Sequence, residues 1–363
     1  MKRLVGVVVA LGLVAGVAVI IEQNCCRPPG KDTSITLRGL IGSEKSDFFD
    51  NRDVQRALTA KGLTVHVDHA GSWQMATDTE NGSYDFAFPA SSVAAAAIKT
   101  KITTVPARPF YSPLVVLARS DAVDLMKQVG LASDSNGILT FKTSYYLDLA
   151  TGTQTWQGLD TGDQKHPALR GQIFVSTTNP QTSSSAALYL ATMAYLRNKN
   201  QVVSTTADAD RVGAELHDLM ARQGSQHASS DQLFKDFIAG VGNPLIWTYE
   251  SEAAERARNG KLPSDVMVLY PDTGIQSDHT IVELTDSAKS FSQALQEDPT
   301  LTTLEAQFGF RPSGDPAAFG KAMGGTEKRF VADVTQLKVA QAVPPSTDNL
   351  RELINVAMTG RTN

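Results

Sequence analysis

Hydrophobic and polar positions along this chain repeat with two different periods, and the changes between them predict strands that are followed by helices. Short apolar runs typical of buried strands occur at 35–41, 63–67 and 84–88. Each run leads through a polar turn into a segment with helical spacing. Three strands that are each followed by a helix predict a parallel sheet.

A second group of elements is predicted from residue 113 onward. The predicted strands are 113–118, 243–251, 265–270 and 280–284. The predicted helices lie near 121–130, 207–222, 230–239, 252–259 and 346–358. Alternation of strands and helices on both sides of Ser120 predicts two α/β units, and 363 residues are enough for both.

The stretch 174–196 changes from strand to helix through a turn rich in hydroxyl groups. An apolar run ends at Val175, and the spacing of an amphipathic helix begins at Ser185. The first turn of a helix has four backbone N–H groups without internal partners and carries a partial positive charge. The candidate ligand-binding residues in this turn are Thr178, Thr182, Ser183 and Ser184. A simple N-cap at Thr182 or Ser183 is the alternative, although one hydroxyl suffices for that role.

Serine residues also follow the three strands of the first unit. They are Ser43, Ser72, Ser91 and Ser92. Ligands of open parallel sheets bind beyond the carboxyl ends of the strands, so these loops are expected to converge on one rim. Tyr249, at the end of a strand in the second unit, is expected to close the side of the pocket. Lys45 and Arg311 are the nearest candidates for positive charge.

Residues 1–21 are predicted to form a transmembrane signal-anchor. Lys2 and Arg3 precede 18 consecutive residues that are all Leu, Val, Ile, Ala or Gly. At about 1.5 Å per residue this run spans about 27 Å, close to the hydrocarbon thickness of a bilayer. The leading positive charges keep the amino end in the cytoplasm and place the rest of the chain outside. A cleaved signal peptide is the alternative.

The two cysteines, Cys25 and Cys26, lie in the predicted linker 22–34. A lipid on Cys25 is another possible anchor, but Glu22, Gln23 and Asn24 are not the small residues expected before a lipidated cysteine. Adjacent cysteines rarely bond to each other, so pairing between molecules is a further option. The rest of the chain contains no cysteine, which excludes a disulfide framework and a thiol nucleophile there.

Composition and charge narrow the classes of function. An apolar content of 42% with 20% charged residues is ordinary for a soluble globular protein. A net charge of −5, a pI of about 5.7 and the lack of a basic stripe argue against nucleic-acid binding. An anion can still be bound, because helix termini and hydroxyl groups need no side-chain charge to hold one.

Residue combinations that carry catalysis or bind metals are weak in this sequence. On a strand, His66 and Asp68 share one face while His69 points away, so solvated strand-end residues are favoured over a metal site. The nucleophile elbow, the P-loop and the dinucleotide-binding motif do not occur. Tyr249 and Glu250 could form an acid–base pair, but the helix dipole explains Glu250 adequately. We expect no enzyme activity, no cofactor and no metal.

Four short segments resemble extracellular solute-binding proteins of the two-lobed (type II) periplasmic class that serves phosphate, sulfate and molybdate transport. They are Gly42-Ser43, Pro89-Ala90-Ser91-Ser92, Asn179-Pro180-Gln181-Thr182-Ser183-Ser184 and Tyr249-Glu250-Ser251. Phosphate-type members carry a similar Pro-x-Thr-Ser turn whose hydroxyls and amides hold the anion. The resemblance spans roughly residues 33–330. It departs from the family where Ser184-Ser185 replaces a usual glycine and where Glu44 adds negative charge beside the expected pocket.

The resemblance implies an α/β, two-lobed periplasmic-binding-protein-like (type II) fold with two hinge crossings, preceded by the N-terminal transmembrane helix. The crossings are expected at 113–118 and 266–280. Lobe 1 is expected to comprise 35–117 and 265–363, and lobe 2 to comprise 118–264.

The same resemblance implies a membrane-tethered protein that captures a small polar or anionic ligand between its lobes, for transport or sensing. Its domain would be extracellular or periplasmic, and its partner would be an ABC-type permease or another membrane protein. A degenerate binding-protein fold that serves as an extracellular protein-interaction module is the alternative. A hydrolase is a third hypothesis, which turnover of esters or phosphates would test.

Overall fold

The computed structural model describes residues 34–162, 165–325 and 327–361. The predicted anchor at 1–21, both cysteines and all but the last residue of the predicted linker lie outside the described residues. No helix within the described ranges combines the length and the apolar composition that crossing a bilayer requires. The described residues from Thr36 onward form one compact unit.

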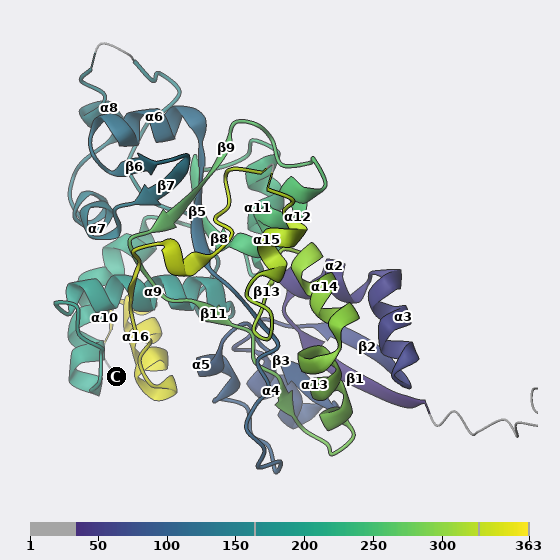
Figure 1. Ribbon diagram of the computed structural model, residues 1–363. Coiled ribbons are helices and arrows are strands. Elements are labelled where there is room, and N and C mark those ends of the chain that lie inside the picture. The colour runs from purple at the N-terminus through teal and green to yellow at the C-terminus, as the bar shows by residue number, and fades with distance from the viewer. Residues whose placement is uncertain (1–33, 163–164, 326, 362–363) are drawn as a thin grey trace, which may run out of the picture. The chain divides into compact units, whose positions relative to one another are not determined.

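The first lobe contains a four-stranded sheet in the order β12-β3-β1-β2 (Figure 1). Its strands are β1 (Ile35–Ile41), β2 (Leu63–His69), β3 (Phe86–Phe88) and β12 (Val282–Glu283). β1 and β3 are parallel, as predicted, with Gly39 opposite Phe86. A Cβ atom at Gly39 would lie 2.1 Å from the Phe86 ring, so only glycine allows this ring to cover the strand.

Aromatic side chains fill much of the first lobe's core, including a Phe86–Phe291 stack at 4.3 Å and a Phe48–Phe49 edge contact at 5.1 Å. The helices of this lobe are η1 (Ser43–Lys45), α2 (Ser46–Phe49), α3 (Arg52–Ala60), α4 (Met75–Asn81), α5 (Ser92–Ala95), α13 (Ala288–Glu297) and α14 (Pro299–Gln307). Because η1 and α2 directly follow β1, the loop that contains Ser43 stays close to the sheet's edge.

The second lobe contains a five-stranded mixed sheet in the order β6-β7-β9-β5-β8. Its strands are β5 (Leu114–Arg119), β6 (Ala132–Ser135), β7 (Ile138–Phe141), β8 (Leu245–Tyr249) and β9 (Val266–Pro271). Its helices are α6 (Ser120–Gln128), α7 (Thr143–Thr151), α8 (Trp156–Leu159), α9 (Ser184–Arg197), α10 (Thr206–Ala221), α11 (Ser230–Ile238), α12 (Glu250–Arg258), α15 (Ala318–Ala322) and α16 (Thr347–Thr359). β5 is antiparallel to both β8 and β9, so this sheet is not the parallel type found between β1 and β3.

Two local predictions in the stretch 174–196 differ from the structure. The predicted strand before Val175 is absent, and Ser176 instead makes a single bridge to β8, through Ser176 N to Leu245 O at 3.0 Å and Trp247 N to Ser176 O at 2.9 Å. α9 is not amphipathic over its first three turns, because every residue from Ser184 to Ala194 is buried. Its small Ser and Ala side chains let neighbouring elements pack against it on all sides.

Between the lobes lies a three-stranded sheet in the order β11-β4-β13, which makes three crossings where two were predicted. The first crossing lies just before the predicted 113–118, because β5 already pairs within the second-lobe sheet. Its strands are β4 (Phe110–Ser112), β11 (Ser277–Asp278) and β13 (Arg311–Pro312). Across the described residues the chain passes between the lobes at each of these strands. The third passage, at β13, carries the chain from α14 in the first lobe to α15 in the second.

The third crossing changes the division of the chain between lobes. β9 pairs with β5 and β7 in the second-lobe sheet, and α16 packs along α10 (Figure 1). Phe319 of α15 and Leu353 of α16 are both fully buried in second-lobe cores. The predicted assignment of all of 265–363 to the first lobe therefore does not match the packing. Shorter elements in this region are β10 (Thr273–Gly274), η2 (Val334–Gln336) and β14 (Ala340–Gln341), and β14 pairs in parallel with β10.

Candidate functional site

A cavity of about 230 Å³ opens between the lobes and receives residues from both of them. Its first-lobe lining residues are Gly42, Ser43, Glu44, His69, Ala70, Gly71 and Ser72, and its second-lobe lining residues are Ser183, Ala228, Ser229, Ser230 and Tyr249. Ser43, Ser72, Ser183 and Tyr249 were predicted for a ligand pocket, and all four line this cavity.

Two long helices of the second lobe begin at the cavity. Ser183 is the N-cap of α9 and Ser229 is the N-cap of α11, yet neither side chain makes a capping hydrogen bond. The interpretation of Ser183 as a simple cap is therefore not supported. The first backbone N–H groups of both helices are left for other acceptors, and both helix dipoles place partial positive charge beside the cavity.

A chain of hydroxyl groups supports the second-lobe wall. Ser185 Oγ lies 3.0 Å from Ser183 Oγ and 2.9 Å from Thr178 Oγ1. Thr178 and Ser185 are both fully buried, so Thr178 holds the lining residue Ser183 in place instead of facing the cavity as predicted. Ser185 was not among the predicted site residues, and the hydroxyl-rich run that contains it was the available signal.

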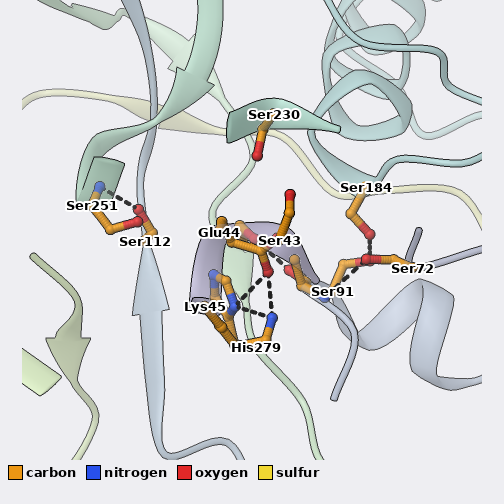
Figure 2. Close-up of polar contacts among 12 residues, drawn as sticks. Ser43, Glu44, Lys45, Ser72, Ser91, Ser112, Ser184, Ser230, Ser251 and His279 are labelled. Atoms are coloured by element: carbon orange, nitrogen blue, oxygen red, sulfur yellow. Dashed lines mark hydrogen bonds and ion pairs between the residues drawn. The ribbon is translucent and has the colours of Figure 1, made fainter. Parts of the chain in front are cut away.

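Three of the predicted residues join the lobes beside the cavity. Ser91 Oγ lies 2.9 Å from Ser184 Oγ across the lobes, a contact shown in Figure 2. The carbonyl oxygen of Thr182 accepts a hydrogen bond of 3.1 Å from the backbone N–H of Trp73. These contacts make Ser91, Ser184 and Thr182 part of the interface that closes the cavity, and none of them lines it.

The approach of the two lobes is closest at Gly71. A Cβ atom at this position would lie 2.5 Å from the carbonyl oxygen of Thr182, so only glycine permits the observed contact. Ser72, the next residue, accepts a hydrogen bond of 3.1 Å from the backbone N–H of Ala90 through its hydroxyl. Ser92, also predicted, donates its backbone N–H to Asp278 Oδ1 at 2.9 Å and does not line the cavity.

Lys45 does not supply the charge that was expected of it in the pocket. Its side chain is fully buried, forms an ion pair with Glu44, and donates to Nδ1 of His279 at 3.1 Å (Figure 2). Burial lowers the pKa of Lys45, against the opposing effect of Glu44. Burial and then the nearby Lys45 hold the pKa of His279 well below its usual value, so His279 is a neutral acceptor. The charged side chain that lines the cavity from this cluster is Glu44.

Arg311 also supplies no positive charge to the cavity, because it is paired with Glu250. Its guanidinium forms two hydrogen bonds to the Glu250 carboxylate, Nε to Oε2 at 2.6 Å and NH2 to Oε1 at 2.9 Å. Both side chains are buried, and neither residue lines the cavity.

Burial raises the pKa of Tyr249 well above its usual value, so Tyr249 presents a hydroxyl donor. Glu250, the other member of the suggested acid–base pair, accepts hydrogen bonds from Arg311 and Tyr270 instead.

His69 and Asp68, which were considered for metal binding, have different partners. His69 lines the cavity and its Nε2 lies 2.8 Å from Ser46 Oγ, while Asp68 pairs with Arg38 at 2.6 Å. Among the described residues there is no group of three or more His, Cys, Asp or Glu side chains suited to a metal ion.

Ser229 and Ser230 line the cavity but were not predicted to do so. The signal was present in the sequence, because Ser229-Ser230 stands at the start of a helix in the same way as Ser183-Ser184 does. Figure 2 shows the Ser230 side chain directed toward Ser43 and Glu44 of the opposite lobe. The wall thus combines hydroxyls, two helix starts and one carboxylate.

Solved structures resemble this chain in fold, although no sequence family does. No protein-family model matches the sequence, and no curated protein matches it significantly. The sulfate-binding protein SubI from Mycobacterium tuberculosis H37Rv is similar in structure, with a TM-score of 0.50 and 17% identity, over 84% of this chain and 96% of that one. A periplasmic thiamin binding protein has a TM-score of 0.56 and 10% identity, over 91% of this chain and 97% of that one.

A third similar structure is an ABC transporter solute binding protein from Thermotoga lettingae TMO, determined with alpha-D-tagatose. Its TM-score is 0.55 at 14% identity, over 89% of this chain and 94% of that one. Such identities are informative about the fold alone. The chain has the two-lobed α/β fold of type II periplasmic solute-binding proteins, which is the fold that the four sequence segments implied.

Proposed function

We propose that this protein captures a small polar or anionic solute between its two lobes, outside the cytoplasm. The observation that supports this most directly is the cavity that both lobes line with hydroxyls, where α9 and α11 begin without side-chain caps. Free N–H groups and helix dipoles at such starts favour the oxygen atoms of an acidic or polar ligand. Three similar structures are named as a sulfate-binding protein, a thiamin binding protein and a solute binding protein bound with alpha-D-tagatose, which agrees with this role.

The size and position of the cavity favour a compact ligand. Its volume of about 230 Å³ is below the range of roughly 300–1,000 Å³ that is usual for drug-sized ligands. Ser43 and Ser72 approach from one lobe and Ser183 and Ser230 from the other. A solute that contacts both sets stabilises the closed arrangement, because it loses half of its contacts when the lobes separate.

We infer that residues 1–21 hold this domain at the outer face of a membrane, where it delivers solute to an ABC-type permease or reports on it to another membrane partner. The positively charged start and the 18 apolar residues that follow it support this inference. Cell fractionation and sequencing of the mature amino terminus test it. A soluble protein that begins near residue 19 would contradict the anchor and favour a cleaved signal peptide.

Binding is tested by thermal shift against phosphate, sulfate, molybdate, tungstate, small organic acids and sugars. A ligand at 100 times its Kd stabilises the folded state by about 2.7 kcal/mol, which is a measurable shift. Ser183→Ala removes a lining hydroxyl, and loss of a hydrogen bond to a charged ligand weakens binding roughly 10- to 150-fold. Ser290→Ala, on the exposed face of α13, is the matched control and leaves affinity unchanged.

Three outcomes of this experiment contradict different parts of the proposal. Equal affinity of Ser183→Ala and wild type would place the ligand elsewhere. The lack of any shift across the panel would favour the protein-interaction module. Turnover of an ester or a phosphate ester would favour the hydrolase.

A further inference from the structure

A second, smaller cavity of about 60 Å³ adjoins the first one and shares Ser43 and Glu44 with it. Its other walls come from α2 and from Phe308 and Phe310 in the first lobe, and from α11 and α12 in the second. The volume is about twice the share of one water molecule in the liquid, which suits a single polar group of a ligand. The shared residues make the two cavities neighbours on either side of Glu44.

Carboxyl groups outnumber cations around this second cavity. The five acids are Glu44, Asp47, Asp231, Glu252 and Glu255, and the two cations are Lys235 and Arg256. Lys235 lies 2.9 Å from Asp231, Arg256 lies 3.7 Å from Glu255, and the buried Lys45 is paired with Glu44. No ion pair with a described cation is found for Asp47 or Glu252, so neither carboxyl group is matched by a cation of the protein.

Glu252 is the more enclosed of these two acids. Its carboxyl group accepts hydrogen bonds from the hydroxyls of Ser230, at 2.9 Å, and Thr248. These hydroxyl donors hold the carboxyl group in position at the cavity. Glu252 can therefore still accept a hydrogen bond from a cationic ligand group.

A further acceptor in the same cavity lacks a partner. Ser251 is 2% exposed and lines the cavity, and its hydroxyl oxygen makes no hydrogen bond within the described residues. An ammonium group has three N–H donors and no acceptor. Glu252, Asp231 and Ser251 offer it three acceptors from adjoining helix starts.

We propose that the solute is a zwitterion, with an acidic group at the starts of α9 and α11 and an ammonium group in the second cavity against Glu252 and Asp231. This inference rests on the proposed function and narrows its ligand class. The two cavities adjoin at Glu44, so a chain of a few bonds joins the two charged groups. Inorganic oxyanions lack the second group and leave the acceptors of the second cavity without a cationic partner.

Matched sets of compounds test the proposal by thermal shift. Each set holds a zwitterion, its acidic half and its cationic half: β-alanine with propionate and ethylamine, phosphoethanolamine with phosphate and ethanolamine, and taurine with methanesulfonate and ethylamine. We expect at least one zwitterion to raise the melting temperature more than either of its halves.

Failure of this inference is distinguishable from failure of the proposed function. If an anion alone stabilises as strongly as its zwitterion, or if only a sugar binds, the zwitterion is excluded while solute binding stands. If no compound of any class binds, both proposals fail.

Calorimetry on Glu252→Gln tests the position of the ammonium group. The change removes a carboxyl group that can ionise beside the ammonium group and keeps a polar group of the same size, so a zwitterion binds roughly 10- to 150-fold more weakly while its acidic half is unaffected. Glu215→Gln, at a partly exposed ion pair on α10, is the control and changes neither affinity. Equal weakening of the zwitterion and its acidic half, or no change in either, would overturn the assignment.

Proton release provides a readout in the wild-type protein. Burial, and then Glu44 and Asp231, raise the pKa of Glu252 to about 8, against opposing hydrogen bonds from Thr248 and Ser230. The carboxyl group is therefore mostly protonated at pH 7, and an adjacent ammonium group favours its ionised form.

Zwitterion binding at pH 7 should therefore release close to one proton, as measured by calorimetry in two buffers with different ionisation enthalpies. Affinity for β-alanine should rise as the pH approaches 8, because neither of its own groups titrates there. Binding without proton release in wild type, or with the same release in Glu252→Gln, would contradict the proposal.

Discussion

Replacement of Arg311 by methionine should destabilise the protein strongly without weakening solute binding. Arg311 lies on β13, the third crossing between the lobes, and its side chain is 2% exposed. It bonds to Glu250 at 2.6 and 2.9 Å, and it donates to the carbonyl oxygens of Val331 at 2.6 Å and Ala332 at 3.1 Å. One side chain thus ties the start of α12 to the segment that follows α15.

The expected loss is about 3–5 kcal/mol, because removal of one partner leaves Glu250 as an uncompensated buried charge. The double variant Arg311→Met, Glu250→Gln removes that charge as well. It should recover part of the loss, although the bonds to Val331 and Ala332 remain broken and the hydroxyl of Tyr270 keeps an amide oxygen to donate to.

Urea denaturation followed by circular dichroism measures both variants, and equal m values keep the free energies of unfolding comparable. A loss below about 1 kcal/mol for Arg311→Met, or a double variant as unstable as the single one, would refute this account of the ion pair. Loss of solute binding at unchanged stability would instead restore Arg311 as a ligand-binding residue.

Three further changes test other contacts. Gly71→Ala should hold the lobes apart, because its Cβ would lie 2.5 Å from Thr182 O; we expect a larger radius of gyration by small-angle X-ray scattering and weaker solute binding. Glu305→Gln should stabilise the protein by about 1–3 kcal/mol near pH 8, since burial alone raises the pKa of this unpaired carboxyl well above its usual value. The wild type should lose stability as the pH rises above the ordinary carboxyl pKa, and urea denaturation of the variant should show a flatter pH profile. Tyr146→Phe should cost about 1–3 kcal/mol in urea denaturation, and more than Tyr189→Phe, because the Tyr146 hydroxyl joins the Tyr189 hydroxyl at 2.7 Å and also accepts a backbone N–H at 2.9 Å.

Much of the first lobe was predictable because its elements are long enough to show a period. β1 was predicted at 35–41 and has those bounds, and β2 extends the prediction at 63–67 by two residues. The loops after these strands meet at one rim because carboxyl ends of neighbouring strands lie together. Ser43 and Ser72 reached the cavity for this reason.

The third crossing could not be predicted from local pattern. β11 and β13 have two residues each, which is too short for any alternation to appear. They are strands because β4 lies between them and pairs with both. Their formation depends on residues more than 150 positions apart in the chain, so periodicity within a short window carries no sign of it.

The complete burial of the first three turns of α9 could not be predicted for a different reason. Ala187, Leu190 and Ala194 do share a face at helical spacing, and that face was read as the apolar one. The opposite face carries Ser185 and Thr192 beside the buried Leu188 and Tyr189, and its hydroxyls can be enclosed when they find partners. Thr192, for example, is fully buried and donates to the Leu188 carbonyl oxygen at 2.8 Å.

The charge of the site depends on which ionic groups are already paired within the protein. The sequence does not reveal this pairing, so the charge was the property of the site that was predicted least well. Lys45 and Arg311 were the cations expected to supply charge to the pocket, and both are held by buried glutamates, Glu44 and Glu250. No lysine or arginine lines the cavity within the described residues, so an acidic group there relies on helix starts and hydroxyls, while Glu252 on the neighbouring helix keeps hydroxyl partners only. The helix starts still favour an acidic group, so the two demands are met together only by a ligand that carries both charges. Amino-substituted acids are therefore the first compounds to compare with simple oxyanions.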